Sequence, residues 1–122
     1  MKTTVKGEID RFEAVYTGHG IPRDMLCAWL EDVDGYVARE ILLTPDIPLD
    51  YSYEKSPDTE LLVSEPPYRR VYYTYLSAMA DFVMKQFNTY SSELSEYNGT
   101  MRDYRHYILS IRPIIEKRRA EV

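Results

Sequence analysis

Few side chains in this 122-residue sequence are placed for catalysis or metal binding. The two histidines, His19 and His106, lie far apart in the sequence. They therefore do not form a pair spaced four residues apart on one helix, which could bind zinc. Cys27 has no basic neighbour in sequence, whereas a nucleophilic cysteine needs a lowered pKa and a nearby base. We therefore predict no catalytic residue, no cofactor and no metal site, and we expect Cys27 to be a packed or half-buried, inert thiol.

Acidic residues offer two alternatives to that prediction. Asp32-Val33-Asp34-Gly35 resembles part of a calcium-binding loop, in which glycine is the sixth residue. The first and twelfth positions, which need oxygen ligands, would then be Leu30 and Ile41, so we reject a calcium site. Carboxylates also populate the middle of the chain, namely Asp46, Asp50, Asp58 and Glu60. Two of them could act as acid and base in a hydrolase, but no spacing singles out a pair. An enzyme is therefore the less favoured reading.

Length and charge narrow the remaining classes of protein. A chain of 122 residues suits one domain, residues 1–122, with a core of its own. The net charge of −5 argues against broad nucleic-acid binding, which needs clustered Lys and Arg. We expect a cytoplasmic protein, because no apolar stretch resembles a membrane span or a signal peptide. The basic cluster Lys117-Arg118-Arg119 is interpreted as a solvated helix end, with a DNA contact as the alternative.

Apolar spacing predicts a mostly all-α fold of about four helices. The expected helices cover 7–16, a stretch from Pro22 to Ile41, a stretch opening at Pro67, and 91–111. The second helix has the apolar stripe Leu26, Trp29, Leu30, Val33, Val37 and Ile41, and we expect it to continue past Gly35. Off this stripe we expect Asp32, Asp34, Arg39 and Glu40. The third helix has the stripe Tyr68, Tyr72, Leu76, Met79, Val83 and Phe87. The fourth has Leu94, Tyr97, Met101, Tyr104, Ile108 and Ile111, with the alternating spacing of a seam between two packed helices.

The ends of the last two helices follow from residue types. Residues 88–92 favour turns, so we predict a turn there and an antiparallel packing of the last two helices. Pro113 is expected to end the last helix, or to set it at an angle to a basic tail at 112–122.

Residues 44–65 interrupt the helical pattern and are predicted to form a long loop or arm, with a brief strand as an option. The chain has 12 tyrosines and 3 phenylalanines, which suits either an interface or the edge of a core. We predict the arm from Asp46 to Val63 as an interface, so that its removal should prevent assembly and leave helicity intact. The candidate interface residues are Tyr51, Tyr53, Leu61, Leu62 and Tyr73.

Several short pieces, in order, resemble a group of small prophage proteins from Firmicutes. Upstream, Trp29 to Gly35 resembles the group's tryptophan-containing helix. The further pieces are Asp58 to Val63, Pro67-Tyr68, Tyr72, Tyr75-Leu76, Ala78, Asp81, Tyr90-Ser91-Ser92, Tyr97-Asn98, Asp103-Tyr104 and Tyr107. Ser91-Ser92 stands where the group tends to have asparagines. The first 20 residues and the basic tail show no match.

The resemblance implies a head–tail connector, also called an adaptor or head-completion protein, of a tailed phage. Such a protein is small, helical and non-enzymatic, and assembles as a ring homo-oligomer beneath the portal. The implied partners are copies of itself, the portal and tail-completion proteins, with DNA passing through the ring without specific binding. The implied location is the bacterial host cytoplasm and then the virion, without membrane or small-molecule substrate. The alternative is a helical adaptor or regulatory module that binds another protein.

Overall fold

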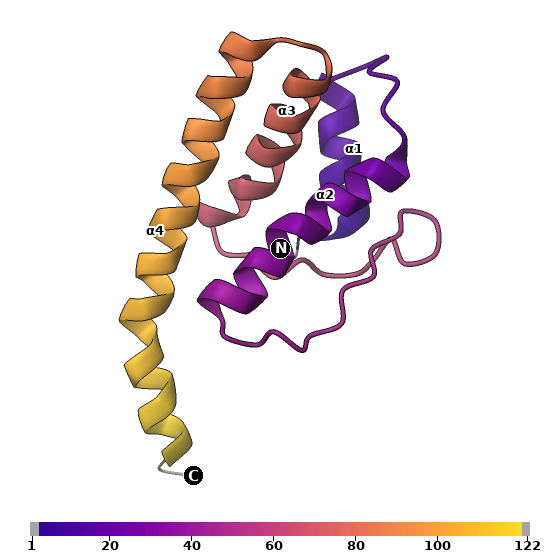
Figure 1. Ribbon diagram of the computed structural model, residues 1–122. Helices are drawn as coiled ribbons and strands as arrows, with labels where there is room; N and C mark the ends of the chain where they lie inside the picture. Colours follow the sequence, from indigo (N-terminus) through magenta and orange to yellow (C-terminus); the bar gives the residue numbers. More distant parts are fainter. Residues whose placement is uncertain (1–2, 121–122) are drawn as a thin grey trace.

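Four α-helices form where the sequence has apolar residues at helical spacing, which confirms the all-α prediction (Figure 1). The computed structural model describes residues 3–120, with side chains described up to Arg112. The helices are α1 (Val5–Val15), α2 (Arg23–Tyr36), α3 (Val71–Val83) and α4 (Phe87–Ala120). A π-helical turn (Val37–Ile41) extends α2, and a 3-10 turn (Tyr68–Arg70) precedes α3. Among the described residues there is no β-strand, and only Thr4 and Glu60 form an isolated bridge.

The helix α1 is capped by the long loop rather than by its own sequence alone. The Thr4 hydroxyl accepts a hydrogen bond from the Gly7 amide at 3.0 Å, as an N-cap residue does. The next unpaired amides, Val5 and Lys6, donate to the carbonyls of Thr59 and Pro57 at 3.0 and 3.1 Å. Residues 57–59 therefore complete the first turn of α1 and hold the loop against it.

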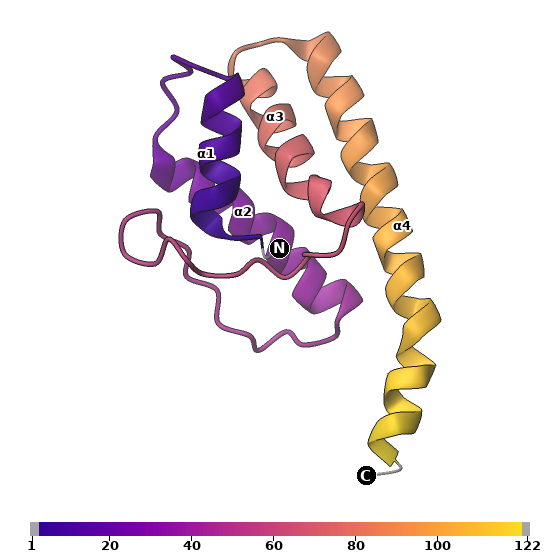
Figure 2. The ribbon, with the colours of Figure 1, turned by 180° about the vertical axis from the view of Figure 1, so that it is seen from behind.

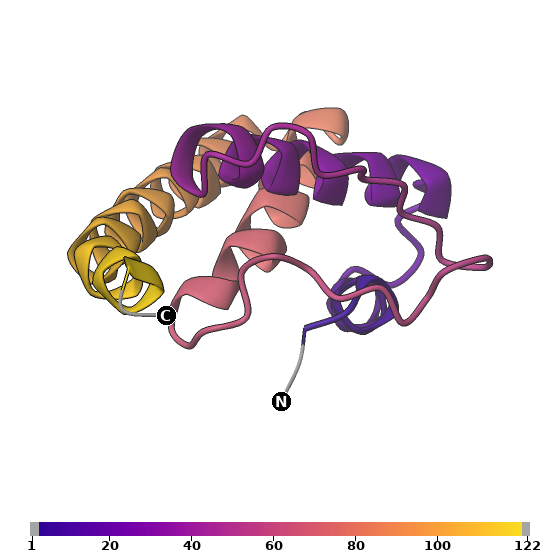
Figure 3. The same ribbon diagram turned by 90° about the horizontal axis from the view of Figure 1, so that it is seen from below.

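The core lies where α3 is flanked by α1 and α4, with α2 packed across one side (Figures 2 and 3). Val5, Ile9 and Phe12 contribute from α1, and the whole predicted stripe of α2 is buried, including Leu26, Trp29 and Leu30. Gly35 does not interrupt α2, as predicted. No helix within residues 3–120 is both long and apolar enough to cross a bilayer.

Tyrosine rings fill much of the seam between the antiparallel helices α3 and α4. Tyr75 of α3 lies 4.9 Å from Tyr97 of α4, measured between ring centroids. Tyr68 lies 5.6 Å from Tyr104 and 5.1 Å from Tyr107. The predicted stripe of α4 faces this seam, because Met101, Tyr104 and Ile108 are buried. These tyrosines belong to the edge of the core, which was one of the two interpretations that the composition left open.

The turn between α3 and α4 lies at Met84–Gln86, so the prediction of a turn at 88–92 is wrong. The amides of Lys85 and Gln86 donate to the carbonyls of Phe82 and Asp81, at 3.1 and 2.7 Å. This pair of bonds is the Schellman motif, in which the residue after the helix is left-handed and is usually glycine. Lys85 occupies that place with φ 61°. The polar residues 88–92 instead form the first turn of α4, where such residues favour capping.

Replacing Lys85 by glycine should stabilise the protein by about 1 kcal/mol. A residue with a Cβ atom pays roughly that much in the left-handed region, whereas glycine does not. Urea unfolding followed by circular dichroism measures the change. An equal or lower stability would mean that the left-handed conformation carries no such cost here.

The helix α4 continues through Pro113 to Ala120, so the predicted end at Pro113 is wrong and residues 112–120 of the predicted tail are helical. Residues 121–122 lie outside the described residues. Proline costs one helical hydrogen bond, the one that the Leu109 carbonyl would accept. Leu109 is exposed, so that carbonyl can be hydrated. One residue earlier, the Arg112 guanidinium donates to the Ile41 carbonyl, which anchors α4 to the end of the π-helical turn.

Candidate interface surfaces

A buried carboxylate, Asp34, fastens the long loop to the helices. Asp34 has no exposed surface, although it lies on α2 among residues that were expected to be polar and outward-facing. Its Oδ1 accepts a hydrogen bond from the Tyr72 hydroxyl at 2.6 Å, and its Oδ2 accepts from the Leu62 amide at 3.1 Å and from the Tyr51 hydroxyl. The Tyr72 hydroxyl in turn accepts from the Val63 amide at 2.7 Å. We call Asp34, Tyr51, Leu62 and Tyr72 the Asp34 cluster.

The placement of Asp34 off the apolar stripe is therefore wrong. Asp34 lies four residues after Leu30 and three before Val37, which is the spacing of one helix face. Burial raises the pKa of Asp34, while the hydrogen bonds from Tyr51, Tyr72 and Leu62 oppose that shift. Burial and the adjacent carboxylate also raise the pKa values of the Tyr51 and Tyr72 hydroxyls, which keeps both as donors.

The segment 44–65 is a loop, as predicted, but it packs on the body instead of projecting as an arm (Figure 1). Tyr51 and Leu61, two candidate interface residues, are buried within the chain, so neither presents a surface to a neighbour. Val63 is buried as well. Deleting residues 46–63 would remove these side chains and two donors of the Asp34 cluster. We therefore expect the deletion to unfold the protein, which corrects the expectation that helicity would survive.

Tyr53 is half-buried and is held by the charged side chains of α1 and the start of α2. Its hydroxyl donates to Asp10 at 2.7 Å, and the Arg23 guanidinium lies 4.0 Å from its ring centroid. Arg23 also pairs with Glu13 at 2.9 Å. The hydrogen bonds from Lys6 and Tyr53 lower the pKa of Asp10. Tyr53 is thus used inside the chain, although part of its ring faces solvent.

Leu62 and Tyr73 are the candidate interface residues that remain. Leu62 is half-buried against the core and its amide is committed to Asp34. Tyr73 is half-exposed on α3, with the Arg11 guanidinium 5.3 Å from its ring centroid. The five candidate interface residues do not form one site in the structure. Four of them belong to the loop, whereas Tyr73 lies on α3.

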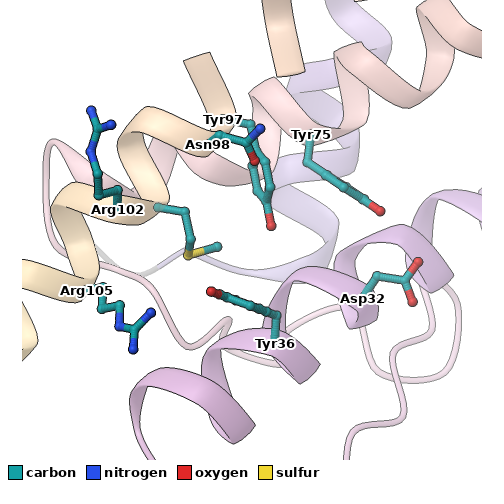
Figure 4. Close-up of a pocket in the computed structure, with 8 residues that line it drawn as sticks. Asp32, Tyr36, Tyr75, Tyr97, Asn98, Arg102 and Arg105 are labelled. Atoms are coloured by element: carbon teal, nitrogen blue, oxygen red, sulfur yellow. The ribbon is translucent and has the colours of Figure 1, made fainter. Parts of the chain in front are cut away.

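A cavity of about 420 Å³ lies between α2, α3 and α4 (Figure 4). Tyr36, Tyr75, Tyr97 and Met101 supply its aromatic and apolar wall, with Asp32 toward one end and Arg105 toward the other. Burial raises the pKa values of the Tyr75 and Tyr97 hydroxyls, so both stay protonated. Aromatic faces beside a guanidinium suit an aromatic or acidic side chain of a protein partner. Sequence reasoning missed this cavity, because its residues come from three helices.

The end of the α3–α4 pair exposes apolar side chains. Phe82, Val83 and Phe87 are 50%, 51% and 55% exposed, and Met84 is 38% exposed. The Phe82 ring contacts those of Phe87 and Tyr90, with centroids 6.0 and 5.2 Å away. We call Phe82, Val83, Met84 and Phe87 the apolar end. Val83 and Phe87 were predicted to continue the buried stripe of the third helix, and that prediction is wrong because α3 ends at Val83.

Metal-ligating side chains do not gather within the part of the chain that the structure describes. No set of three or more His, Cys, Asp or Glu lies close enough to share a metal ion within that part of the chain. Cys27 is buried, as predicted, and burial raises the pKa of its thiol. His19 is fixed by the Ile21 amide, which donates to its Nδ1 at 2.8 Å. The surface features described above are the cavity between α2, α3 and α4 and the apolar end.

Comparisons of the chain with protein-family models, with curated proteins and with solved structures find no match.

Proposed function

We propose that this chain is a phage structural protein, a head–tail connector subunit that assembles as a ring at the portal vertex. The proposal takes its function from the resemblance of residues 29–35 and 58–108 to small prophage connectors. In this role the protein would bind copies of itself, the portal and tail-completion proteins, and would carry no catalytic activity. DNA would pass through the ring without specific contacts.

The observation that carries the proposal is that sequence pieces which match the prophage group contact one another in the structure. Asp34 belongs to the piece Trp29–Gly35, Leu62 to the piece Asp58–Val63, and Tyr72 is a piece by itself. These pieces are separated in sequence, yet their residues bond to one another in the Asp34 cluster. Contacts between the matching pieces are what a resemblance that extends to the fold predicts.

Exposed apolar surface supports assembly. A monomeric protein seldom exposes several large apolar side chains side by side, and the apolar end does so at the tip of two helices. The last turns of α4 also extend beyond the other helices (Figures 1 and 2). The two features lie on different parts of the subunit, as a ring with head-to-tail contacts requires.

The cavity between α2, α3 and α4 favours a second candidate, a helical adaptor that binds a side chain of another protein. This candidate accounts for Tyr36, Tyr97 and Arg105 around a concave site. It predicts a discrete complex with one partner and no ring.

Sequencing the DNA that flanks this gene separates the two candidates. Portal, protease and major-capsid genes just upstream, with tail genes downstream, are expected for a connector. A neighbourhood of metabolic or regulatory genes would contradict the connector and place the adaptor first.

A further inference from the structure

Three tyrosine rings and a carboxylate line the cavity between α2, α3 and α4 (Figure 4). The ring centroids of Tyr75 and Tyr97 lie 4.9 Å apart, and the two rings are tilted by 49°. Tyr36 faces them from α2, one residue before the π-helical turn, which is a rare element that often marks a functional site. Asp32 lies one helical turn before Tyr36, toward the end of the cavity near Tyr75. The cavity is therefore an aromatic wall with a negative charge at one end.

This end of the cavity has no cation of its own. The cation–π pairs among the described residues involve the rings of Tyr53 and Tyr73, and none involves a ring of the cavity. Burial raises the pKa of Asp32, and no positive charge in the described part of the chain lowers it. The negative charge of Asp32 also contributes to the raised pKa of the Tyr75 hydroxyl. A cation from outside the chain would compensate Asp32 and contact the aromatic faces.

The opposite end of the cavity carries positive charge. Arg102 and Arg105 line it on the side away from Asp32, and both side chains are exposed. The Arg102 guanidinium lies 4.0 Å from the carboxylate of its neighbour Asp103, at the limit of an ion pair. Guanidinium groups bind phosphate and carboxylate through paired hydrogen bonds. This end therefore suits an anionic group.

The two ends together select a class of ligand. An alkylated ammonium group binds well among aromatic rings, because the attraction to the ring faces needs no hydrogen-bond acceptor. A phosphate suits the arginine end. A volume of about 420 Å³ lies within the range of sites for small molecules. The ligand that combines these features is a small zwitterion with an ammonium group at one end and a phosphate at the other.

We propose that the cavity binds a zwitterion of the phosphocholine type, with its quaternary ammonium group among Tyr36, Tyr75 and Tyr97 and its phosphate at Arg105. Asp32 lies beside the ammonium group and compensates its charge. One chain supplies the whole site, so the inference goes beyond the connector proposal and does not depend on assembly. The phosphocholine group can belong to a solute or to a lipid surface.

Isothermal titration calorimetry of the full chain with phosphocholine tests the site. We expect measurable binding at millimolar concentration. The neutral isostere dimethylbutyl phosphate, in which carbon replaces the quaternary nitrogen, should bind roughly tenfold more weakly, because it loses the attraction to the rings and to Asp32. The isostere keeps the shape and the phosphate, so the difference reports the cationic group alone.

Substitutions at the two ends should affect the two ligands differently. Asp32→Asn should weaken phosphocholine binding roughly fivefold, as expected for a partly exposed ion pair, without weakening the isostere. Arg105→Gln should weaken both ligands roughly tenfold, because both carry the phosphate. The matched controls are Glu40→Gln and Arg39→Gln, exposed charges of the π-helical turn that do not line this cavity, and they should change neither affinity. Circular dichroism checks that all four variants fold.

The absence of a binding heat at millimolar phosphocholine overturns the proposal, as does equal affinity for phosphocholine and its isostere. Equal effects of Asp32→Asn and Glu40→Gln also overturn it. Sedimentation with phosphatidylcholine vesicles then identifies the source of the group. Protein that sediments with these vesicles, and not with phosphatidylglycerol vesicles, takes the group from a lipid surface, whereas protein that stays in solution takes it from a solute. Both outcomes support the site, and the connector proposal is tested separately by the presence of the protein in phage particles.

Discussion

Replacing Asp34 by alanine should lower the free energy of unfolding by about 3 kcal/mol. The substitution leaves the Tyr51 and Tyr72 hydroxyls and the Leu62 amide without their acceptor, and each buried unpaired group costs roughly 1–3 kcal/mol. The estimate lies at the low end of the sum, because removing the buried carboxylate also removes its desolvation cost. Urea unfolding at constant pH measures it.

The matched control is Asp32→Ala, two residues away on the exposed face of the same helix. It should change stability by no more than about 0.5 kcal/mol, as surface substitutions usually do. Equal losses for Asp32→Ala and Asp34→Ala would mean that the hydrogen bonds of the Asp34 cluster contribute nothing.

Asp34 should also make stability depend on pH in a predictable direction. Its pKa is raised in the folded protein, so the folded state holds this proton more tightly than the unfolded state. The stabilisation is fully present below the ordinary aspartate pKa and is lost as pH rises through the raised value. Asp34→Asn removes the titrating carboxyl group, so wild type should lose stability relative to Asp34→Asn as pH rises above the ordinary aspartate pKa of about 4. A difference that stays constant with pH, or grows in favour of wild type, would contradict this assignment.

Replacing Tyr104 by alanine should cost about 4 kcal/mol. Tyr104 is among the largest fully buried side chains, and its ring packs on Tyr68 and Tyr107 in the α3–α4 seam. Removing a buried aromatic ring typically costs 3–5 kcal/mol through lost burial and the cavity left behind. Thermal and urea unfolding should both report the loss.

Tyr104→Phe provides the control for the hydroxyl. The ring, which carries the packing, is kept, and we expect a change within about 1 kcal/mol. A loss as large as that of the alanine variant would shift the role of Tyr104 from packing to hydrogen bonding.

Helical spacing was enough to predict the helices and the seam of α4, because burial selects a face every three to four residues. The same spacing indicated that Asp34 is buried, because it shares a helix face with Leu30 and Val37. The prediction placed Asp34 off that face because its side chain is polar. A polar residue on a buried face is a signal that loop donors from elsewhere must reach it. The donors themselves, Tyr51 and Leu62, were not predictable, since they depend on the path of a loop without periodicity.

The predictions made from local residue types were wrong for both ends of α4. The Schellman turn at Lys85 lacks the glycine that usually marks it, so the polar run 88–92 was taken for the turn. Pro113 was expected to end the helix or to set it at an angle to the tail, and the end was wrong because an exposed helix tolerates one lost hydrogen bond. The cavity needed side chains from three helices, and no spacing along the chain could bring those together.

Quantitative mass spectrometry of purified phage particles, induced from the strain that carries this gene, tests the connector proposal most directly. The predicted result is that the protein is present in several copies per particle, in a fixed ratio to the portal protein that persists through repeated purification. Particles that are complete and infectious without the protein would contradict the proposal.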